Sequence, residues 1–171
     1  VNDLGSSAGA AVERRRFERL FETLHLQPSL LAAIVDWVDS DDVPEAGGAE
    51  DAWYRAAAAP GLAANAPAVR VQELGAVRGM TMETLAGLAR FVTALPVDAP
   101  LNVNTAPAEV LAASISDIDP GELATLIAGR AERPFASLAD FRERLPKNAS
   151  IADEAMYTVK SRYFLVSVRA R

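Results

Sequence analysis

Residues 36–51 read DWVDSDDVPEAGGAED, and this acidic segment decides how the chain is organised. It holds seven acidic residues and no basic one, while the whole chain of 171 residues has 23 acidic and 17 basic residues and a net charge of −6. The remainder of the chain is therefore close to neutral. Pro44, Gly47 and Gly48 interrupt any helix, so the sequence predicts a long irregular loop, which Pro60-Gly61 extends. A loop of this length usually has a function.

Amphipathic helices are predicted on both sides of the acidic segment. Before it, apolar residues at three- and four-residue spacing predict a long helix over residues 11–26 and a shorter one over 30–38. After it, short helices are predicted over residues 71–77, 81–95, 106–113, 120–131, 137–145 and 151–157. Residues 161–169 are rich in aromatic and β-branched residues and predict a strand, for which 68–72 is a weaker candidate partner. The fold class is α+β, with a helical unit between a long N-terminal helix and a C-terminal sheet.

Composition excludes several classes of protein. The chain has no cysteine, so disulfides, zinc–thiolate sites, iron–sulfur clusters and cysteine nucleophiles are ruled out. An isoelectric point near 4.8 argues against a protein that binds nucleic acid by bulk attraction to phosphate. No apolar run approaches the roughly 20 residues that span a bilayer. Since the chain begins at Val1 and ends at Arg171 within the predicted strand, we expect it to be a piece of a longer protein. An N-terminal membrane segment of that protein would then be missing from this piece.

The acidic segment is interpreted as a calcium site, because calcium prefers six to eight oxygen ligands from flexible loops. On the EF-hand template, Asp39, Asp41 and Glu50 fall at ligand positions, but Val43 and Pro44 stand where Asp or Asn and then Gly belong, so the loop is not an EF-hand. The predicted ligands are Asp39, Asp41 and Glu50, and Asp42 or Asp51 together with carbonyls near Gly47 and Gly48 would fill the coordination sphere of a Ca²⁺ cofactor. A solvated acidic loop is the plainer alternative. It is less favoured, because seven unscreened carboxylates resist ordering without a cation.

Residues 101–138 resemble the helix-hairpin-helix modules of DNA-uptake and DNA-repair proteins. The resemblance rests on Leu101-Asn102-Val103-Asn104-Thr105-Ala106 and on Phe135-Ala136-Ser137-Leu138. Such modules bind phosphate through the backbone N–H groups of a glycine hairpin. Here Asp117 and Asp119 stand at the glycine positions and place carboxylates against phosphate. A nucleic-acid-binding module is therefore kept only as the alternative function.

The sequence gives little support for an enzyme. His25 is the only histidine, and no serine lies in a nucleophile-elbow context, so a hydrolase that uses His25 is the weakest hypothesis. His25 is expected to be a partly buried residue near the end of the first helix. Trp37, Trp53 and Tyr54 are interpreted as an apolar wall beside the acidic loop rather than as a ligand pocket. No enzyme activity is expected.

Several motifs together resemble one family. These are Val1-Asn2-Asp3-Leu4, Asp36-Trp37-Val38-Asp39-Ser40-Asp41, Gly48-Ala49-Glu50-Asp51, Tyr54, Asn65, Glu73-Leu74, Gly79, Leu101-Asn102-Val103-Asn104-Thr105-Ala106 and Ser161-Arg162-Tyr163-Phe164. They resemble general secretory pathway protein K, the large minor pseudopilin of type II secretion systems. The resemblance implies a pseudopilin fold with a long N-terminal helix, a small antiparallel sheet and a large inserted all-α domain that contains the helix-hairpin-helix-like elements.

The same resemblance implies a domain division and a site. The domains are residues 1–66 with the N-terminal helix and the calcium loop, 67–148 as the inserted helical domain, and 149–171 as a truncated part of the sheet. In that family calcium binds in the acidic loop, which agrees with the ligands named above.

The resemblance also implies partners and a place in the cell. Such a protein joins minor pseudopilins I and J at the tip of a periplasmic pseudopilus, where its bulky insert blocks another subunit and so caps the filament. It is anchored to the inner membrane by a helix absent here, it binds no nucleic acid, and secreted cargo is a possible further partner. The predicted partner-binding face of the first helix is Phe17, Leu20, Phe21 and Leu24.

Overall fold

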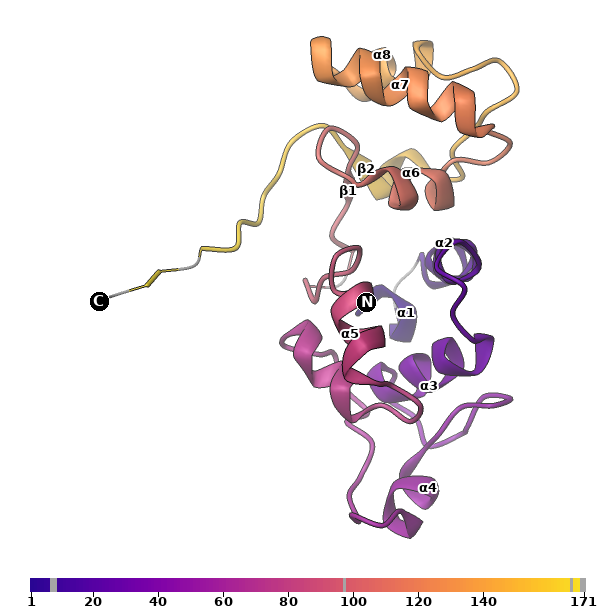
Figure 1. Cartoon of the computed structure of the whole chain (residues 1–171), viewed down its shortest axis with the longest axis vertical. Helices are drawn as coiled ribbons and strands as arrows, with labels where there is room; N and C mark the ends of the chain where they lie inside the picture. The colour runs from indigo at the N-terminus through magenta and orange to yellow at the C-terminus, as the bar shows by residue number, and fades with distance from the viewer. Residues whose placement is uncertain (7–8, 97, 167, 170–171) are drawn as a thin grey trace.

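The computed structural model describes residues 1–6, 9–96, 98–166 and 168–169. These residues form two helical units that follow one another along the long axis, and residues 161–166 run away from both (Figure 1). The first unit, residues 1–96, contains α1 (Asp3–Ser6), α2 (Ala10–Thr23), α3 (Pro28–Val38), α4 (Asp51–Ala56), the 3₁₀ helix η1 (Val71–Ala76) and α5 (Met82–Leu88). The second unit, residues 101–160, contains β1 (Leu101–Asn102), α6 (Ala108–Ser114), α7 (Pro120–Glu132), α8 (Leu138–Glu143), the 3₁₀ helix η2 (Glu154–Met156) and β2 (Tyr157–Thr158).

Each unit has its own hydrophobic core. The first core is centred on α3, whose residues from Leu30 to Val38 are all buried. The second core surrounds Leu111 and Phe141, which are fully buried. The change from one core to the other falls near residues 95–101, whereas the division drawn from the sequence has boundaries after residues 66 and 148.

Local signals explain where the main helices begin and end. Pro28 stands at the first position of α3, and Pro120 at the first position of α7, where a missing N–H costs nothing. Asp119 and Glu122 form a capping box at the start of α7. Helix α2 ends in a left-handed residue, His25, with φ of 54°. The Leu26 amide then donates to the Phe21 carbonyl, which is the pattern of a Schellman motif.

Helix α2 joins the two units. Phe17 and Phe21 belong to the core of the first unit, while α2 also packs against α6 of the second unit. On that side the Arg16 guanidinium lies 5.2 Å from the centre of the Tyr157 ring. The Arg19 guanidinium donates to the Ser116 hydroxyl. Helix α2 therefore contacts both units.

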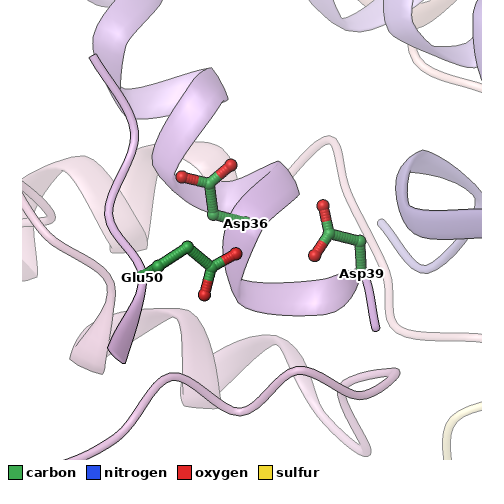
Figure 2. A group of neighbouring side chains, drawn as sticks. All are labelled: Asp36, Asp39 and Glu50. Carbon is green, nitrogen blue, oxygen red and sulfur yellow. The ribbon is translucent and has the colours of Figure 1, made fainter. Parts of the chain in front are cut away.

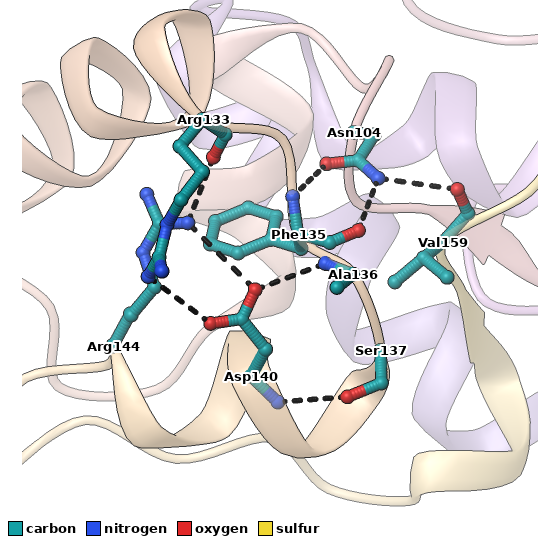
Figure 3. Close-up of polar contacts among 8 residues, drawn as sticks. All are labelled: Asn104, Arg133, Phe135, Ala136, Ser137, Asp140, Arg144 and Val159. Carbon is teal, nitrogen blue, oxygen red and sulfur yellow. Dashed lines mark hydrogen bonds and ion pairs between the residues drawn. The ribbon is translucent and has the colours of Figure 1, made fainter.

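An asparagine side chain closes each unit. In the second unit, the Asn104 amide accepts from the Phe135 N–H at 2.8 Å and donates to the carbonyls of Phe135 and Val159 (Figure 3). In the first unit, Asn2 accepts from the Ala68 N–H at 2.8 Å and donates to the carbonyls of Ala68 and Leu95. Both side chains tie the start of a unit to its middle and its end.

The sheet differs from the expected one. The predicted antiparallel sheet is wrong, since β1 pairs with β2 in parallel, with Leu101 opposite Tyr157 and Asn102 opposite Thr158. The predicted strand over 161–169 is absent from its described residues, and Phe164 and Leu165 are 80% and 96% exposed. No described strand lies beside them to form backbone hydrogen bonds, so their β-propensity alone does not produce a strand. The weaker candidate, residues 68–72, runs instead into η1.

Most predicted helices are present but shorter. The expected long N-terminal helix is represented, within the described residues, by the 14 residues of α2. Its apolar face lies inside the chain, as in a core helix. Residues 89–95 and 151–153 lie outside any helix, so the predictions over 81–95 and 151–157 were too long. None of the helices in the described ranges has both the length and the apolar character needed to cross a membrane.

A candidate cation site

Three carboxylates converge where the acidic segment begins and ends. Asp36 lies in the last turn of α3, Asp39 is the residue after that helix, and Glu50 directly precedes α4. One oxygen from each residue lies within 4.8 Å of the other two. Figure 2 shows the three side chains near one another beside the end of α3. The fold thus brings together carboxylates that are up to fourteen positions apart in the sequence.

Several oxygens of this cluster are buried and have no hydrogen-bond partner among the described residues. Asp36 is completely buried, and its Oδ2 is one of these atoms. Glu50 is only 3% exposed, and both of its carboxylate oxygens lack a partner, as does Oδ1 of Asp39. A buried carboxylate without a partner is strongly destabilising. The cluster therefore has the chemistry of a site that a cation completes.

The electrostatics of the cluster point the same way. Burial, followed by repulsion from Asp41 and Asp36, raises the pKa of Asp39 to about 6. Burial, followed by repulsion from Asp36 and Asp39, raises the pKa of Glu50 to about 7. The pKa of Asp36 is also raised, mainly by burial. A divalent cation would relieve both the desolvation and the mutual repulsion.

The ligand set suits a hard cation. All the available donors are oxygens, which calcium and magnesium prefer, and no thiol or imidazole belongs to the cluster. The residues present therefore fit Ca²⁺ in type. Asp36, Asp39 and Glu50 would hold the ion, and backbone carbonyls or water would complete its coordination.

Gly48 allows the loop to come close to the cluster. A Cβ atom at this position would lie 2.0 Å from Oδ2 of Asp36, so no other residue fits without displacing that carboxylate. The Gly48 carbonyl accepts a hydrogen bond from the Arg78 guanidinium at 2.8 Å. Arg78 also lies over the Trp53 ring, and its backbone N–H donates to the Tyr54 hydroxyl. The second half of the loop is thereby fastened to the segment before α5.

The aromatic residues beside the loop belong to the packing of the first unit. Trp37 and Tyr54 are buried, with ring centres 5.3 Å apart in an edge-to-face arrangement. Trp53 packs edge-to-face on Tyr54 at 5.0 Å. This arrangement is an apolar wall, as the sequence predicted, rather than a set of rings around an open pocket.

The structure brings together only part of the predicted ligand set. Asp39 and Glu50 are in the cluster, whereas Asp41 and Asp42 are exposed outside it. Asp51 is already engaged, because one oxygen pairs with Arg55 at 2.6 Å and the other accepts from the Ala63 N–H at 3.0 Å.

Sequence reasoning left Asp36 out of the candidate ligand set, although it lies in the cluster. The available signal was its position three residues before Asp39, which places both on one side of the end of α3. Asn65 was noted as a motif residue only. Its Oδ1 is a further buried oxygen without a partner, while its amide nitrogen donates to the Asp41 carbonyl.

The predicted partner-binding face lies mostly inside the chain. Phe17, Leu20 and Phe21 are buried, and Leu24 is partly buried against the first core. Phe17 and Leu20 also line a cleft of about 370 Å³ between the units. In the described part of the chain, these four side chains pack inside the protein. Their contact with another protein stays a prediction. His25 is exposed, not partly buried, because it lies beyond the end of α2.

The helix pair α6–α7 carries carboxylates where a helix-hairpin-helix module would receive phosphate. Asp117 occupies the connection with φ of 58°, a conformation that favours glycine. The Asp119 side chain accepts from the Glu122 N–H at 2.8 Å and so caps the N-terminus of α7. That helix end is therefore occupied by the chain's own carboxylate.

Two family models cover nearly the whole chain. Both are described as type II secretion system protein K, and they match residues 1–97 and 101–160. The chain belongs to the type II secretion system protein K family. The two matches meet where the core of the first unit gives way to that of the second.

Individual relatives agree with this assignment. Type II secretion system protein K of Pseudomonas aeruginosa is 37% identical over 157 residues, which are 89% of this chain and 46% of that protein. The protein of the same name from Pectobacterium carotovorum subsp. carotovorum is 32% identical over 169 residues, which are 95% of this chain and 52% of that protein. The chain thus spans about half the length of these curated relatives.

A solved structure shows the same fold. It is the crystal structure of the GspK–GspI–GspJ complex from the type 2 secretion system of enterotoxigenic Escherichia coli. The match has a TM-score of 0.72 and 22% sequence identity, and it covers 94% of this chain and 61% of that one. At this identity the likeness concerns the fold alone.

Proposed function

We propose that this chain is part of a minor pseudopilin, a structural subunit of a type II secretion pseudopilus, with no catalytic role. The observation that carries the proposal is the pair of family matches over residues 1–97 and 101–160. Within the longer protein, these residues would form a helical body on the periplasmic side of the inner membrane, placed at the tip of the filament. There their bulk would prevent a further subunit from stacking and so cap the filament.

The partners in this proposal are minor pseudopilins I and J. Support comes from the solved relative, whose crystal contains GspK together with GspI and GspJ. The alternative of nucleic-acid binding finds no support at the α6–α7 connection, since Asp117 and Asp119 stand where phosphate would bind. The test is to mix the full-length periplasmic part of the protein with I and J of the same organism and to measure complex formation by size-exclusion chromatography with light scattering. A stable 1:1:1 complex is expected, and three separate species would contradict the proposal.

We further propose that calcium stabilises the first unit by binding Asp36, Asp39 and Glu50. The support is the set of buried carboxylate oxygens without partners on these three residues. Because calcium would bind the folded state only, a hundredfold excess over Kd would add about 2.7 kcal/mol to the free energy of unfolding. For a chain of this length, that corresponds to a rise in Tm of about 5–10 °C.

The calcium proposal is tested by thermal melts in calcium, in magnesium and in chelator. Glu50→Gln is the informative variant, because it removes the charge of a side chain that makes no hydrogen bond in the described structure. Glu83→Gln is the matched control, since Glu83 is an exposed acid on α5 of the same unit. A calcium-dependent rise in Tm that Glu50→Gln loses and Glu83→Gln keeps is expected. Identical melts in calcium and chelator would contradict it.

A further inference from the structure

We infer that Arg14 of α2 is a positioning residue for the cation site, although it lies outside the acidic segment and cannot bind a cation itself. Both oxygens of Glu45 are held by the Arg14 guanidinium, with Nη1 on Oε1 and Nη2 on Oε2, the latter at 2.6 Å. This is the two-point pairing that arginine makes with a carboxylate. It reaches from α2 to the middle of the acidic loop. The inference rests on the proposed cation site.

The Arg14–Glu45 pair takes Glu45 out of the set of possible ligands. Glu45 is an acid in the same loop as Asp39 and Glu50, and by composition alone it is as good a ligand as they are. Its two oxygens, however, are both engaged by Arg14, and the three clustered ligands do not include it. The role of Glu45 is then to hold the loop rather than the ion.

Glu45 connects Arg14 to the cluster through its backbone. The Glu45 N–H donates to Oδ1 of Asp36 at 3.1 Å, and the Glu45 carbonyl accepts from the Gly48 N–H at 2.9 Å. The first bond engages Oδ1 of Asp36, whereas the buried Oδ2 accepts no hydrogen bond of good geometry from the described residues. The second bond closes the turn that brings Gly48 against that carboxylate. Fixing the Glu45 side chain therefore orients a ligand that Arg14 does not touch.

The Arg14–Glu45 ion pair is expected to contribute little to the folding stability of the protein. The side chains of Arg14 and Glu45 are 36% and 31% exposed, and ion pairs this accessible to solvent contribute little to folding. Partners that orient metal ligands, by contrast, commonly change metal affinity by 10- to 100-fold when removed. The expected effect of losing Arg14 is thus on calcium affinity, with little change in the stability of the calcium-free protein.

The sign of the effect separates positioning from simple electrostatics. Removing a positive charge close to a cation site should tighten cation binding if charge alone matters. Removing a residue that orients a ligand should weaken it. Arg14→Gln is expected to raise the Kd for calcium about tenfold, which is opposite to the electrostatic expectation.

The experiment measures calcium Kd by isothermal titration calorimetry on the folded chain, with Tm in chelator recorded for each variant. Arg15→Gln is the matched control, because Arg15 is the next residue of α2, is exposed and has no side-chain partner in the described residues. Arg14→Lys keeps the charge but loses the two-point pairing, and it should recover only part of the affinity. Glu45→Gln should weaken binding as Arg14→Gln does. The double variant should be no weaker than either single one, because both break the same link.

Each result decides the inference. Weaker calcium binding in Arg14→Gln, with Arg15→Gln equal to or slightly tighter than the parent, supports it. Equal or tighter binding in Arg14→Gln overturns it while leaving the calcium proposal intact. Absence of calcium binding in the unaltered chain overturns the calcium proposal and the inference with it, so the two failures are distinguishable.

Discussion

The first and second units use the same framework with different connections. Each has a Val-Asn pair at or near its start, at Val1-Asn2 and at Val103-Asn104, and each asparagine joins the N–H and the C=O of one distant residue. The residue after the bridged one donates its N–H to a carboxylate four positions later, from Val69 to Glu73 and from Ala136 to Asp140. Both of these acids are followed by a fully buried residue, Leu74 or Phe141.

The units differ in the length of chain that separates a main helix, α3 or α7, from the residue that the asparagine bridges. In the second unit, α7 ends at Glu132 and the bridged Phe135 follows almost at once. In the first unit, α3 ends at Val38 and residues 39–67, with the acidic loop and α4, precede the bridged Ala68. The second unit shows that the framework closes without such a segment. The acidic loop is therefore special to the first unit, and the second unit offers no counterpart for the carboxylate cluster in its described residues.

The strongest test of the shared framework removes its asparagines. Asn2→Ala and Asn104→Ala each delete three hydrogen bonds and leave backbone groups without partners. Each should lower the free energy of unfolding by about 3 kcal/mol, since orphaned buried groups cost about 1–3 kcal/mol apiece. Urea denaturation measures the loss, with Thr105→Ala, an exposed neighbour of Asn104, as the control. A large loss in one unit and none in the other would break the comparison.

Substitution of Gly48 tests the carboxylate cluster, which is special to the first unit. Gly48→Ala places a methyl group against Asp36, so we expect the free energy of unfolding to fall by about 2 kcal/mol. We also expect the calcium-dependent rise in Tm to disappear. Gly61→Ala is the matched control in the same connection, because a Cβ there meets no atom within 4 Å. Thermal melts with and without calcium measure both effects. A Gly48→Ala variant that still responds to calcium would show that the ion lies elsewhere.

The sequence predicted most of the helical framework but little of how it closes. Helical periodicity located α2, α3, α7 and α8 within a few residues, because an amphipathic face repeats locally. The pairing of β1 with β2 joins residues 101–102 to 157–158 in two-residue strands, which are too short to leave a period in the sequence. Residues 161–169 have strand propensity, yet propensity forms a strand only where a partner strand is at hand.

The carboxylate cluster could be predicted only in part, for a similar reason. Charge density located the acidic segment and included Asp39 and Glu50, but it could not rank acids by burial. Asp36 was overlooked because it lies within a helix, and Asp51 was included although Arg55 and the Ala63 N–H already engage it. Burial and engagement are properties of the folded chain, so composition cannot supply them.

The pH dependence of stability should differ between the units. Asp39 and Glu50 have folded-state pKa values raised to about 6 and about 7, above those of the unfolded chain. Groups of this kind contribute stability that is complete below pH 4 and is lost as the pH rises through 6 and 7. In chelator, the Tm of the first unit should thus be several degrees higher at pH 5 than at pH 8. Calcium should remove this gain, because it replaces the protons.

Hydrogen exchange followed by mass spectrometry assigns this effect to a unit. Protection of α3 is expected to fall between pH 5 and pH 8 in chelator, after correction for the intrinsic exchange rate, while protection of α7 stays constant. Glu50→Gln is the control, since it should flatten much of the dependence. Equal changes in α3 and α7 would mean that the carboxylate cluster is not their source.

The smallest predicted effect concerns a residue that each unit holds in the left-handed conformation. His25 follows α2 with φ of 54°, and Asp117 follows α6 with φ of 58°. Glycine relieves about 1–2 kcal/mol of strain at such positions but makes the unfolded chain more flexible by about 0.5–1 kcal/mol. His25→Gly and Asp117→Gly should each raise the free energy of unfolding by about 0.5 kcal/mol in urea denaturation. His25→Ala and Asp117→Ala gain no such relief, so equal stability of the Gly and Ala variants would show that neither position is strained.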